Sequence, residues 1–178
     1  VYLKFMLSKE LGCTIVYARS RNTTETLAKE LREAGFSADY FHAGLSFEEK
    51  EKRQNLWKDD QIRIIVCTNA FGMGIDKPNV RLVIHYDMPD SLEAYYQEAG
   101  RAGRDGLSSY AVLLHSDGDS ASARRRLSSA FPEPDYIRKV YDKLAYYFEI
   151  PEGGGQDKIY PFNLFEFKLS LLNLIVVG

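Results

Sequence analysis

The sequence is poor in the residues that build several common kinds of protein. Its 178 residues include only two cysteines, Cys13 and Cys67, each within an apolar run. A disulfide framework needs more cysteines than this, and a four-cysteine zinc site cannot form. We expect both thiols to be buried in a protein of a reducing compartment. The longest apolar stretch, Leu171 to Val177, contains Asn173 and falls far short of the roughly 20 residues that cross a bilayer.

A secretory signal is also lacking, because Lys4, Lys9 and Glu10 interrupt the first apolar stretch. The first residue is Val1 rather than Met, so we expect the chain to be part of a longer polypeptide. Neither sign of charge dominates: the net charge is −2 and the pI is about 6.0. Domains that bind nucleic acid mainly through bulk positive charge usually have a pI above about 9. The balance still permits a nucleic-acid enzyme whose lysines and arginines line one groove.

Enough apolar sequence is present for a packed core, with 45% hydrophobic and 27% charged residues. Helical signals separate the apolar, β-branched runs that we expect to be strands, which cover residues 14–18, 38–42, 62–67, 81–86 and 110–115. One helix follows Asn22 and stops at Gly35; another starts at Ser46, which forms a capping-box pattern with Glu49. A third follows Asp90, which has the same spacing to Glu93. This alternation predicts an α/β fold with an open, mostly parallel sheet and helices on both faces.

The pattern changes after Asp117. Residues 119–130 and 134–149 have helical spacing, and Pro151 with three glycines at 153–155 then forms a connector. We therefore predict an α/β domain over residues 1–118 and a small helical subdomain without zinc ligands over 119–150. Residues 151–178 are expected to be a linker and the truncated start of a further unit.

Functional residues are expected in loops that follow strands, because ligands bind at the carboxyl ends of an open parallel sheet. One such loop runs from Thr68 to Pro78, with Gly72 and Gly74 on either side of Met73. Glycines let a backbone approach an anionic ligand, and the Asp76 carboxylate is suited to a ribose hydroxyl. Taken alone, this loop is more simply a glycine-containing turn, since it lacks the third glycine of the dinucleotide fingerprint.

A second loop carries Arg101 and Arg104 among three glycines. Their spacing places both guanidinium groups on one face if the preceding helix continues this far. Two arginines on a bare turn suit bidentate recognition of phosphate, including a phosphoryl group in transfer. The alternative, an exposed pair bonded to Glu98 or Asp105, carries equal weight at this point.

A third group of polar residues comprises the turn Ala18–Asn22, with Arg19, Ser20 and Arg21, and, after the second strand, His42 and Gly44. A hydroxyl, an amide and two cations beside a helix N-terminus suit a nucleic-acid phosphate. An ordinary helix cap and a structural histidine are the simpler explanations of these residues alone. The sequence has no Gly-x-x-x-x-Gly-Lys-[Ser/Thr] loop to hold a triphosphate. Paired arginines without such a loop indicate one half of a two-part site.

Four segments in order resemble the second motor domain of RecQ-family, superfamily 2 DNA helicases: IVYARSR at 15–21, YFHAGL at 40–45, TNAFGMGIDKPNVR at 68–81 and YYQEAGRAGRDG at 95–106. The resemblance covers about residues 10 to 118, roughly 60% of the chain. It implies a RecA-like fold and an ATP-dependent DNA helicase, 3′-to-5′ in direction. The run from Ala70 to Pro78 separates this family from DEAD-box RNA helicases.

The resemblance also implies roles for individual residues. Gln97, Arg101 and Arg104 would face the γ-phosphate, with Arg104 the first choice as arginine finger and Arg101 the second. The nucleotide would lie near Gly74, Asp76 and Gly100. DNA backbone contacts would come from Ser20, Arg21, His42, Gly44 and Thr68.

Partners and cofactors follow from the same resemblance. ATP with Mg²⁺ would be bound mainly by the first motor domain of the same polypeptide, absent here, so we expect the isolated chain to be inactive. DNA is the expected partner, at single-strand/duplex junctions, and the location would be cytoplasmic, at a bacterial nucleoid. Zinc is not expected, because the region after residue 118 has no cysteine. Two alternatives stay open: a non-catalytic nucleic-acid- or protein-binding module, and half of an RNA helicase.

Overall fold

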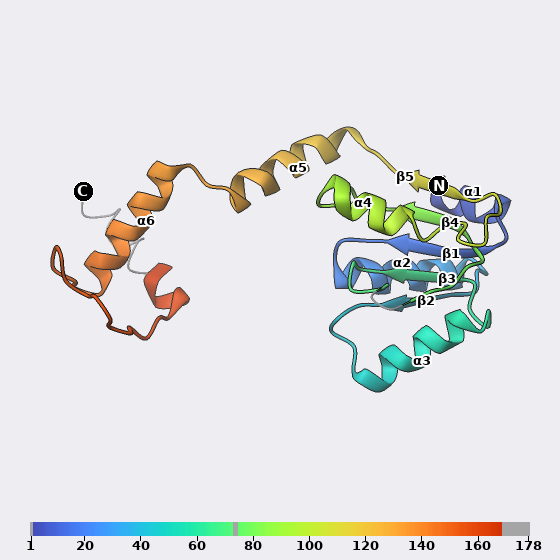
Figure 1. The fold of residues 1–178 in the computed structure, drawn as a ribbon, viewed down its shortest axis with the longest axis horizontal. Coiled ribbons are helices and arrows are strands. Elements are labelled where there is room, and N and C mark those ends of the chain that lie inside the picture. The colour runs from blue at the N-terminus through green and yellow to red at the C-terminus, as the bar shows by residue number, and fades with distance from the viewer. Residues whose placement is uncertain (1, 73–74, 169–178) are drawn as a thin grey trace. The chain divides into compact units, whose positions relative to one another are not determined.

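One open sheet of five parallel strands organises the first part of the chain (Figure 1). The structure, a computed structural model, describes residues 2–72 and 75–168. The strand order is β2-β3-β1-β4-β5, and the strands are β1 Cys13–Tyr17, β2 Ala38–Phe41, β3 Ile64–Cys67, β4 Val80–His85 and β5 Tyr110–Leu113. Each lies within two residues of its predicted position, and the predicted α/β fold is confirmed. β1 and β3 are buried along their whole length because both faces of the sheet are covered.

Helices cover the two faces of the sheet separately. α1 Tyr2–Lys9 and α2 Arg21–Glu33 pack on one face, where Leu7, Leu27 and Leu31 join alternate residues of the central strands in a buried core. The other face is covered by α3 Phe47–Lys58 and by the segment after β3, through Trp57 and Phe71. α4 Leu92–Ala99 ends in a turn that also contacts this second core. The prediction of helices on both faces is therefore correct.

Local capping explains where these helices begin. The Ser20 hydroxyl accepts a hydrogen bond from the Thr23 backbone N–H at the start of α2. Ser46 and Glu49 form both bonds of the predicted capping box on α3. The prediction that Asp90 caps the third helix is wrong, because Ser91 accepts from the Ala94 N–H there. Asp90 instead forms an ion pair with Arg19.

A second compact unit, Ser122–Gly178, follows the first, Val1–Ala121. α5 Asp117–Ala130 spans the boundary, and α6 Pro134–Tyr147 lies in the second unit. Aromatic rings form a small cluster in this unit: Phe148 contacts Tyr160 and Phe162, and Phe167 contacts Tyr147 and Phe162. The described part of the segment after Pro151 thus packs on the end of α6. The apolar stretch 171–177 lies outside the described residues.

Both cysteines are buried with free thiols, Cys13 at the start of β1 and Cys67 at the end of β3. Burial is the main cause that raises the pKa of each thiol, in the case of Cys13 to about 12. These two side chains therefore contribute to packing rather than to thiol chemistry. Among the described residues, no helix is both long enough and apolar enough to cross a membrane.

Candidate functional site

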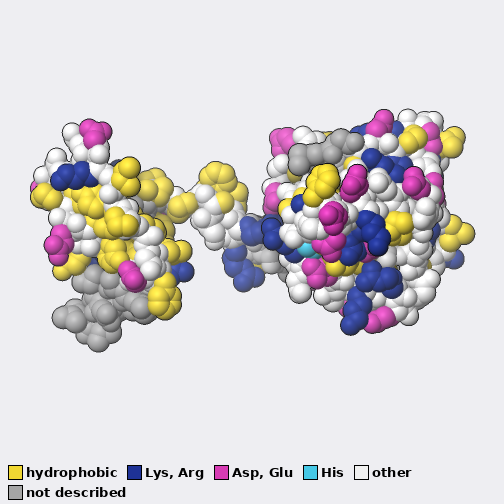
Figure 2. Space-filling view, turned by 90° about the horizontal axis from the view of Figure 1, so that it is seen from below, with side chains coloured by type: hydrophobic (Ala, Val, Ile, Leu, Met, Phe, Trp, Pro, Cys, Tyr) yellow, Lys and Arg dark blue, Asp and Glu magenta, His cyan; other side chains and the backbone are white. Residues whose placement is uncertain are grey.

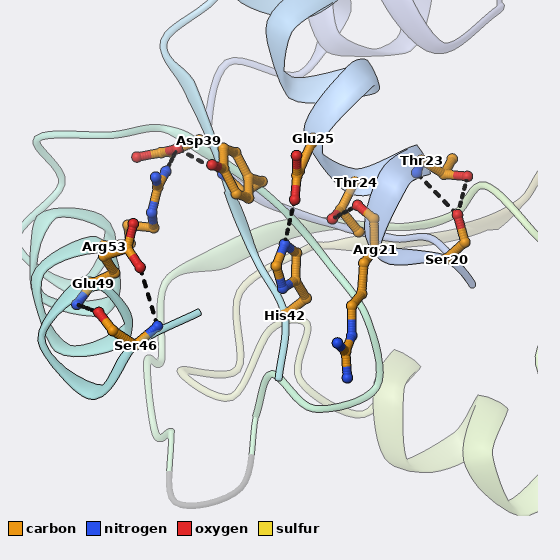
Figure 3. Close-up of polar contacts among 11 residues, drawn as sticks. Ser20, Arg21, Thr23, Thr24, Glu25, Asp39, His42, Ser46, Glu49 and Arg53 are labelled. Atoms are coloured by element: carbon orange, nitrogen blue, oxygen red, sulfur yellow. Dashed lines mark hydrogen bonds and ion pairs between the residues drawn. The ribbon is translucent and has the colours of Figure 1, made fainter. Parts of the chain in front are cut away.

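The residues predicted to contact nucleic acid lie at the carboxyl ends of three adjacent strands. Ser20 and Arg21 follow β1, His42 and Gly44 follow β2, and Thr68 follows β3. Because the three strands are parallel neighbours, their ends meet at one edge of the sheet. Figure 3 shows the Arg21 and His42 side chains side by side, with Ser20 at the start of the helix that carries Arg21.

The two arginines of the first turn have different surroundings. The Arg19 guanidinium donates to the Met88 backbone carbonyl at 3.0 Å and forms an ion pair with Asp90 at 2.5 Å. Arg21 has no ion pair or hydrogen bond from its side chain among the described residues, and its guanidinium lies over Gly44. A Cβ at Gly44 would lie 2.8 Å from Arg21 Nη1. At this edge the Arg21 guanidinium is therefore unengaged, whereas that of Arg19 is held by Met88 and Asp90.

His42 is buried and fixed by its neighbours. Its Nε2 lies 2.8 Å from Oε1 of Glu25 on α2, and its ring stacks on Tyr40 with centroids 5.6 Å apart. Arg53 of α3 covers the Tyr40 ring. It also forms an ion pair with Asp39 (Figure 3). The Nδ1 atom of His42 is buried and has no partner among the described residues. These contacts hold the loop after β2 against α2.

The described parts of the segment after β3, residues 68–72 and 75–79, pack on the second face of the sheet and are anchored at several points. Thr68 is buried, and Phe71 inserts between Phe41 and Trp57 with ring centroids 4.9 and 5.3 Å away. Lys77 is also buried; its Nζ donates to the Lys58 carbonyl at 2.7 Å and pairs with Asp60 at 2.9 Å. Gly74, a predicted nucleotide contact, lies outside the described residues.

The predicted arginine pair is on a turn, since α4 ends at Ala99 and Gly100 caps it. Arg104 Nη1 lies 2.8 Å from Asp76 Oδ1, and the two side chains are 39% and 83% exposed. The carboxylates that the sequence offered as partners are engaged elsewhere: Asp105 pairs with Arg81, and Glu98 contacts His85 at 3.0 Å. The structure thus brings together two predicted site residues, Arg104 and Asp76, from segments far apart in the sequence.

Arg101 differs from Arg104 in being mostly enclosed. Its guanidinium lies over the backbone of Gly72, and Nη1 donates to the Ile75 carbonyl at 3.4 Å. Both arginines line a narrow hollow of about 10 Å³ that reaches Trp57. Gln97, the third predicted catalytic residue, is exposed on α4, one helical turn before Arg101.

A buried polar row that the sequence did not predict lies beneath this site. Tyr17 stacks on His85 with ring centroids 5.6 Å apart, and His85 contacts Glu98 of α4. Burial raises the pKa of Tyr17, Cys67 and Glu98 raise it further, and the charge of Arg101 opposes the rise. Apolar patterning marks Tyr17 and His85 only as ends of strands, so no sequence signal separates them from other core residues.

An open hollow of about 130 Å³ lies next to this row, at the ends of β1 and β4. Tyr17, Arg19, Asn69, Asp87 and Glu98 are among its lining residues. Lys and Arg side chains gather in strips on the face of the first unit seen in Figure 2, with Asp and Glu among them. No group of three or more His, Cys, Asp or Glu side chains in the described part of the chain is arranged to hold a metal ion.

The fold and these motifs define a helicase motor domain. Residues 2–106 match the family model of the helicase conserved C-terminal domain, and the chain belongs to this family. It is RecQ-like within that family. The chain is 46% identical over 132 residues to the ATP-dependent DNA helicase Q-like 2 of Arabidopsis thaliana, covering 74% of this chain. It is 46% identical over 118 residues to the ATP-dependent DNA helicase RecQ of Pasteurella multocida, covering 66%.

A RecQ-like DNA helicase of Caenorhabditis elegans is 50% identical over 113 residues, which are 64% of this chain. The matched parts are between 11% and 19% of the length of these three relatives. Solved structures agree on the fold. A DEAD box protein from Methanococcus jannaschii matches 72% of this chain and 35% of its own, with a TM-score of 0.62 and 30% identity. The match to the Escherichia coli DEAD-box protein SrmB covers 64% of this chain and 67% of that protein's chain, with a TM-score of 0.59 and 29% identity.

Proposed function

We propose that this chain is the second motor half of an ATP-dependent DNA helicase that moves 3′ to 5′, and that it supplies the arginine finger of a shared ATP site. The observation that carries the proposal is Arg104, presented beside Asp76 on a glycine-rich turn. A sequence with no triphosphate-binding loop needs a second domain to hold the phosphates and Mg²⁺. That domain is the proposed partner, from the same polypeptide.

Arg104 has the chemistry that phosphoryl transfer requires. Its guanidinium is always charged and presents a planar set of donors that matches phosphate oxygens. Charge that develops on the transferring phosphoryl group is stabilised by such a cation. The pair with Asp76 is largely exposed, and exposed ion pairs contribute only about 0–1 kcal/mol, so Arg104 can leave Asp76 for a phosphate at little cost. Asp76 then offers its carboxylate to a ribose hydroxyl.

The edge formed by Ser20, Arg21, His42, Gly44 and Thr68 is the proposed DNA track. Arg21 has an unengaged guanidinium there, which packs over the backbone of Gly44. Contacts of this kind are made to phosphates and are independent of base sequence, as movement along a strand requires. Because the track and the turn that carries Arg104 lie at different places, one domain can bind DNA and nucleotide at the same time.

The test is DNA-stimulated ATP hydrolysis by this chain alone and by the chain joined to the phosphate-binding domain of its own polypeptide. We expect no turnover from the chain alone and turnover from the joined protein. Absence of turnover in both would overturn the proposal and favour a binding module. Strand separation on matched DNA and RNA duplexes completes the test, since a clear RNA preference would contradict the DNA assignment.

A further inference from the structure

The guanidinium of Arg101 fills the space where Gly72 has no side chain. A Cβ built at Gly72 would lie 2.3 Å from Arg101 Cζ, 2.4 Å from Nη2 and 2.7 Å from Nε. Gly72 also has a φ of 122°, a conformation that residues with a Cβ rarely adopt. A glycine at this position therefore serves two purposes: it permits the backbone conformation, and it lets the guanidinium pack directly on the peptide.

Arg101 is placed as an interior group rather than as one presented to an incoming phosphate. Its Nη1 donates to the Ile75 carbonyl, three residues after Gly72, so the guanidinium bridges both residues. Its Nε is buried and has no partner among the described residues. The positive charge also acts on two buried groups of neighbouring strands, because it opposes the rise in the pKa of Tyr17 and of Cys67.

The segment that Arg101 holds carries residues from both parts of the proposed site. Thr68 is at its start, beside the track, and Asp76 follows Ile75 near its end. Phe71 anchors the first half in the aromatic core, and Lys77 anchors the far end beside α3. Between these two anchors, Ile75 is buried in the same core, and Arg101 contacts Gly72 and the Ile75 carbonyl. Arg101 comes from the same turn as Arg104.

We propose that Arg101 is a positioning residue: it clamps the segment at Gly72 and Ile75 to the turn after α4, and so fixes where the backbone of Asp76 lies relative to the backbone of Arg104. Its catalytic consequence rests on the function proposed above. Arg104 then acts on the phosphoryl group, whereas Arg101 acts through the segment it holds. The clamp itself is a property of the fold and is open to test without any nucleotide.

Unfolding in denaturant tests the contact directly. Arg101→Ala should lower the unfolding midpoint of the otherwise unchanged chain. Gly72→Ala should lower it too, because the new Cβ displaces the guanidinium. Removing Arg101 in the Gly72→Ala background should then leave the midpoint unchanged or raise it, since the contact is already lost and a clash is relieved. Additive losses in the double variant would show that the two residues do not interact, and would overturn the clamp.

Gly35→Ala is the matched control for backbone strain. Gly35 has a φ of 85°, and no atom lies within 4 Å of a Cβ built there. Its substitution adds strain without displacing a side chain, so combining it with Arg101→Ala should give additive losses. If that combination were also non-additive, the coupling would come from a global change in the unfolded state, and the clamp would again be overturned.

Steady-state kinetics of the full-length helicase separate positioning from catalysis. Arg101→Ala should raise the KM for ATP, with a fall in kcat of less than about 10-fold, whereas Arg104→Ala should act mainly on kcat. Arg101→Lys keeps a donor for the Ile75 carbonyl and should therefore reverse part of the rise in KM. This variant replaces Arg101→Ala in the measurement if the alanine variant does not fold. Equal losses of kcat in both alanine variants, with KM unchanged, would make Arg101 catalytic. Arg104→Ala with full turnover would refute the proposed function while leaving the unfolding test of the clamp intact.

Discussion

The side chains of Arg104 and Asp76 meet at 2.8 Å across 28 residues of sequence. The contact joins the turn after α4 to the segment that follows β3. Both residues were predicted to serve the nucleotide, and in this structure each is the partner of the other. Under the proposed function, nucleotide binding at this place would exchange one ion pair for contacts with phosphate and ribose.

Replacing Arg104 by alanine should lower ATP turnover of the full-length protein by about 10³-fold or more, the effect of removing an arginine finger. DNA affinity should be almost unchanged, because Arg104 lies away from the proposed track. Single-turnover hydrolysis and DNA binding by fluorescence anisotropy measure the two effects. Arg138→Ala is a suitable control, since Arg138 is an exposed arginine of α6 paired with Asp135 at 3.2 Å. Loss of DNA binding with normal hydrolysis per bound complex would make Arg104 a track residue.

Arg21→Ala should weaken DNA binding to a similar extent for every sequence, because the lost contact is to phosphate. The slope of log affinity against log salt concentration should become shallower by about 1, the value for one phosphate contact. Arg19→Ala is the control, since Arg19 is tied to Asp90 and to the Met88 carbonyl and should leave the slope unchanged. Equal changes of slope in the two variants would contradict the distinction between them.

Alkaline pH should destabilise the first unit through Cys13 and Tyr17. Burial raises the pKa of the Cys13 thiol from 9.0 to about 12, and it also raises the pKa of the Tyr17 phenol above its usual 10.0. An unfolded chain releases these protons at lower pH than the folded chain does. The free energy of unfolding should therefore be at its full value below about pH 9 and should fall as the pH rises further.

Urea unfolding at a series of pH values from about 8 to about 11 measures this fall. Cys13→Ala combined with Cys67→Ala should delay its onset to the range where Tyr17 titrates, since Cys67 also has a raised pKa. A fall of the same size and midpoint in that variant would assign the pH dependence to other groups.

Ser46→Ala should destabilise the first unit by about 1 kcal/mol, within the range found for capping serines. The Glu49 backbone N–H loses its acceptor, and the return bond from the Ser46 N–H to the Glu49 carboxylate loses its geometry. Thermal or denaturant unfolding gives the value. Ser8→Ala provides the comparison, because the Ser8 hydroxyl donates only to the Phe5 carbonyl of its own helix and should cost much less.

The strands could be predicted from sequence because a strand buried on both faces must be apolar nearly throughout, as β3 is. α1 was not predicted. Its lysines obscure a short apolar pattern in which Leu3 and Leu7, four residues apart, both reach the core. The capping residue of α4 was misplaced by one position, because Asp90 and Ser91 are both suitable caps and only tertiary contacts with Arg19 separate them.

The candidate site was predictable as a set of residues but not as a set of contacts. Arg101 and Arg104 each follow a glycine, and helical spacing would give them the same face. The helix ends before either of them, and the space above Gly72 encloses one while the other stays at the surface. Such a difference depends on how two distant segments pack, which no local pattern encodes.

The burial of both thiols makes this domain convenient for site-specific labelling. A maleimide reacts with thiolate, and two enclosed thiols with raised pKa values are protected from it at neutral pH. A single cysteine introduced at the exposed Asn22, beside the proposed track, would then be the reactive one. A fluorophore at that position would report strand binding in real time without removal of any native residue from the core.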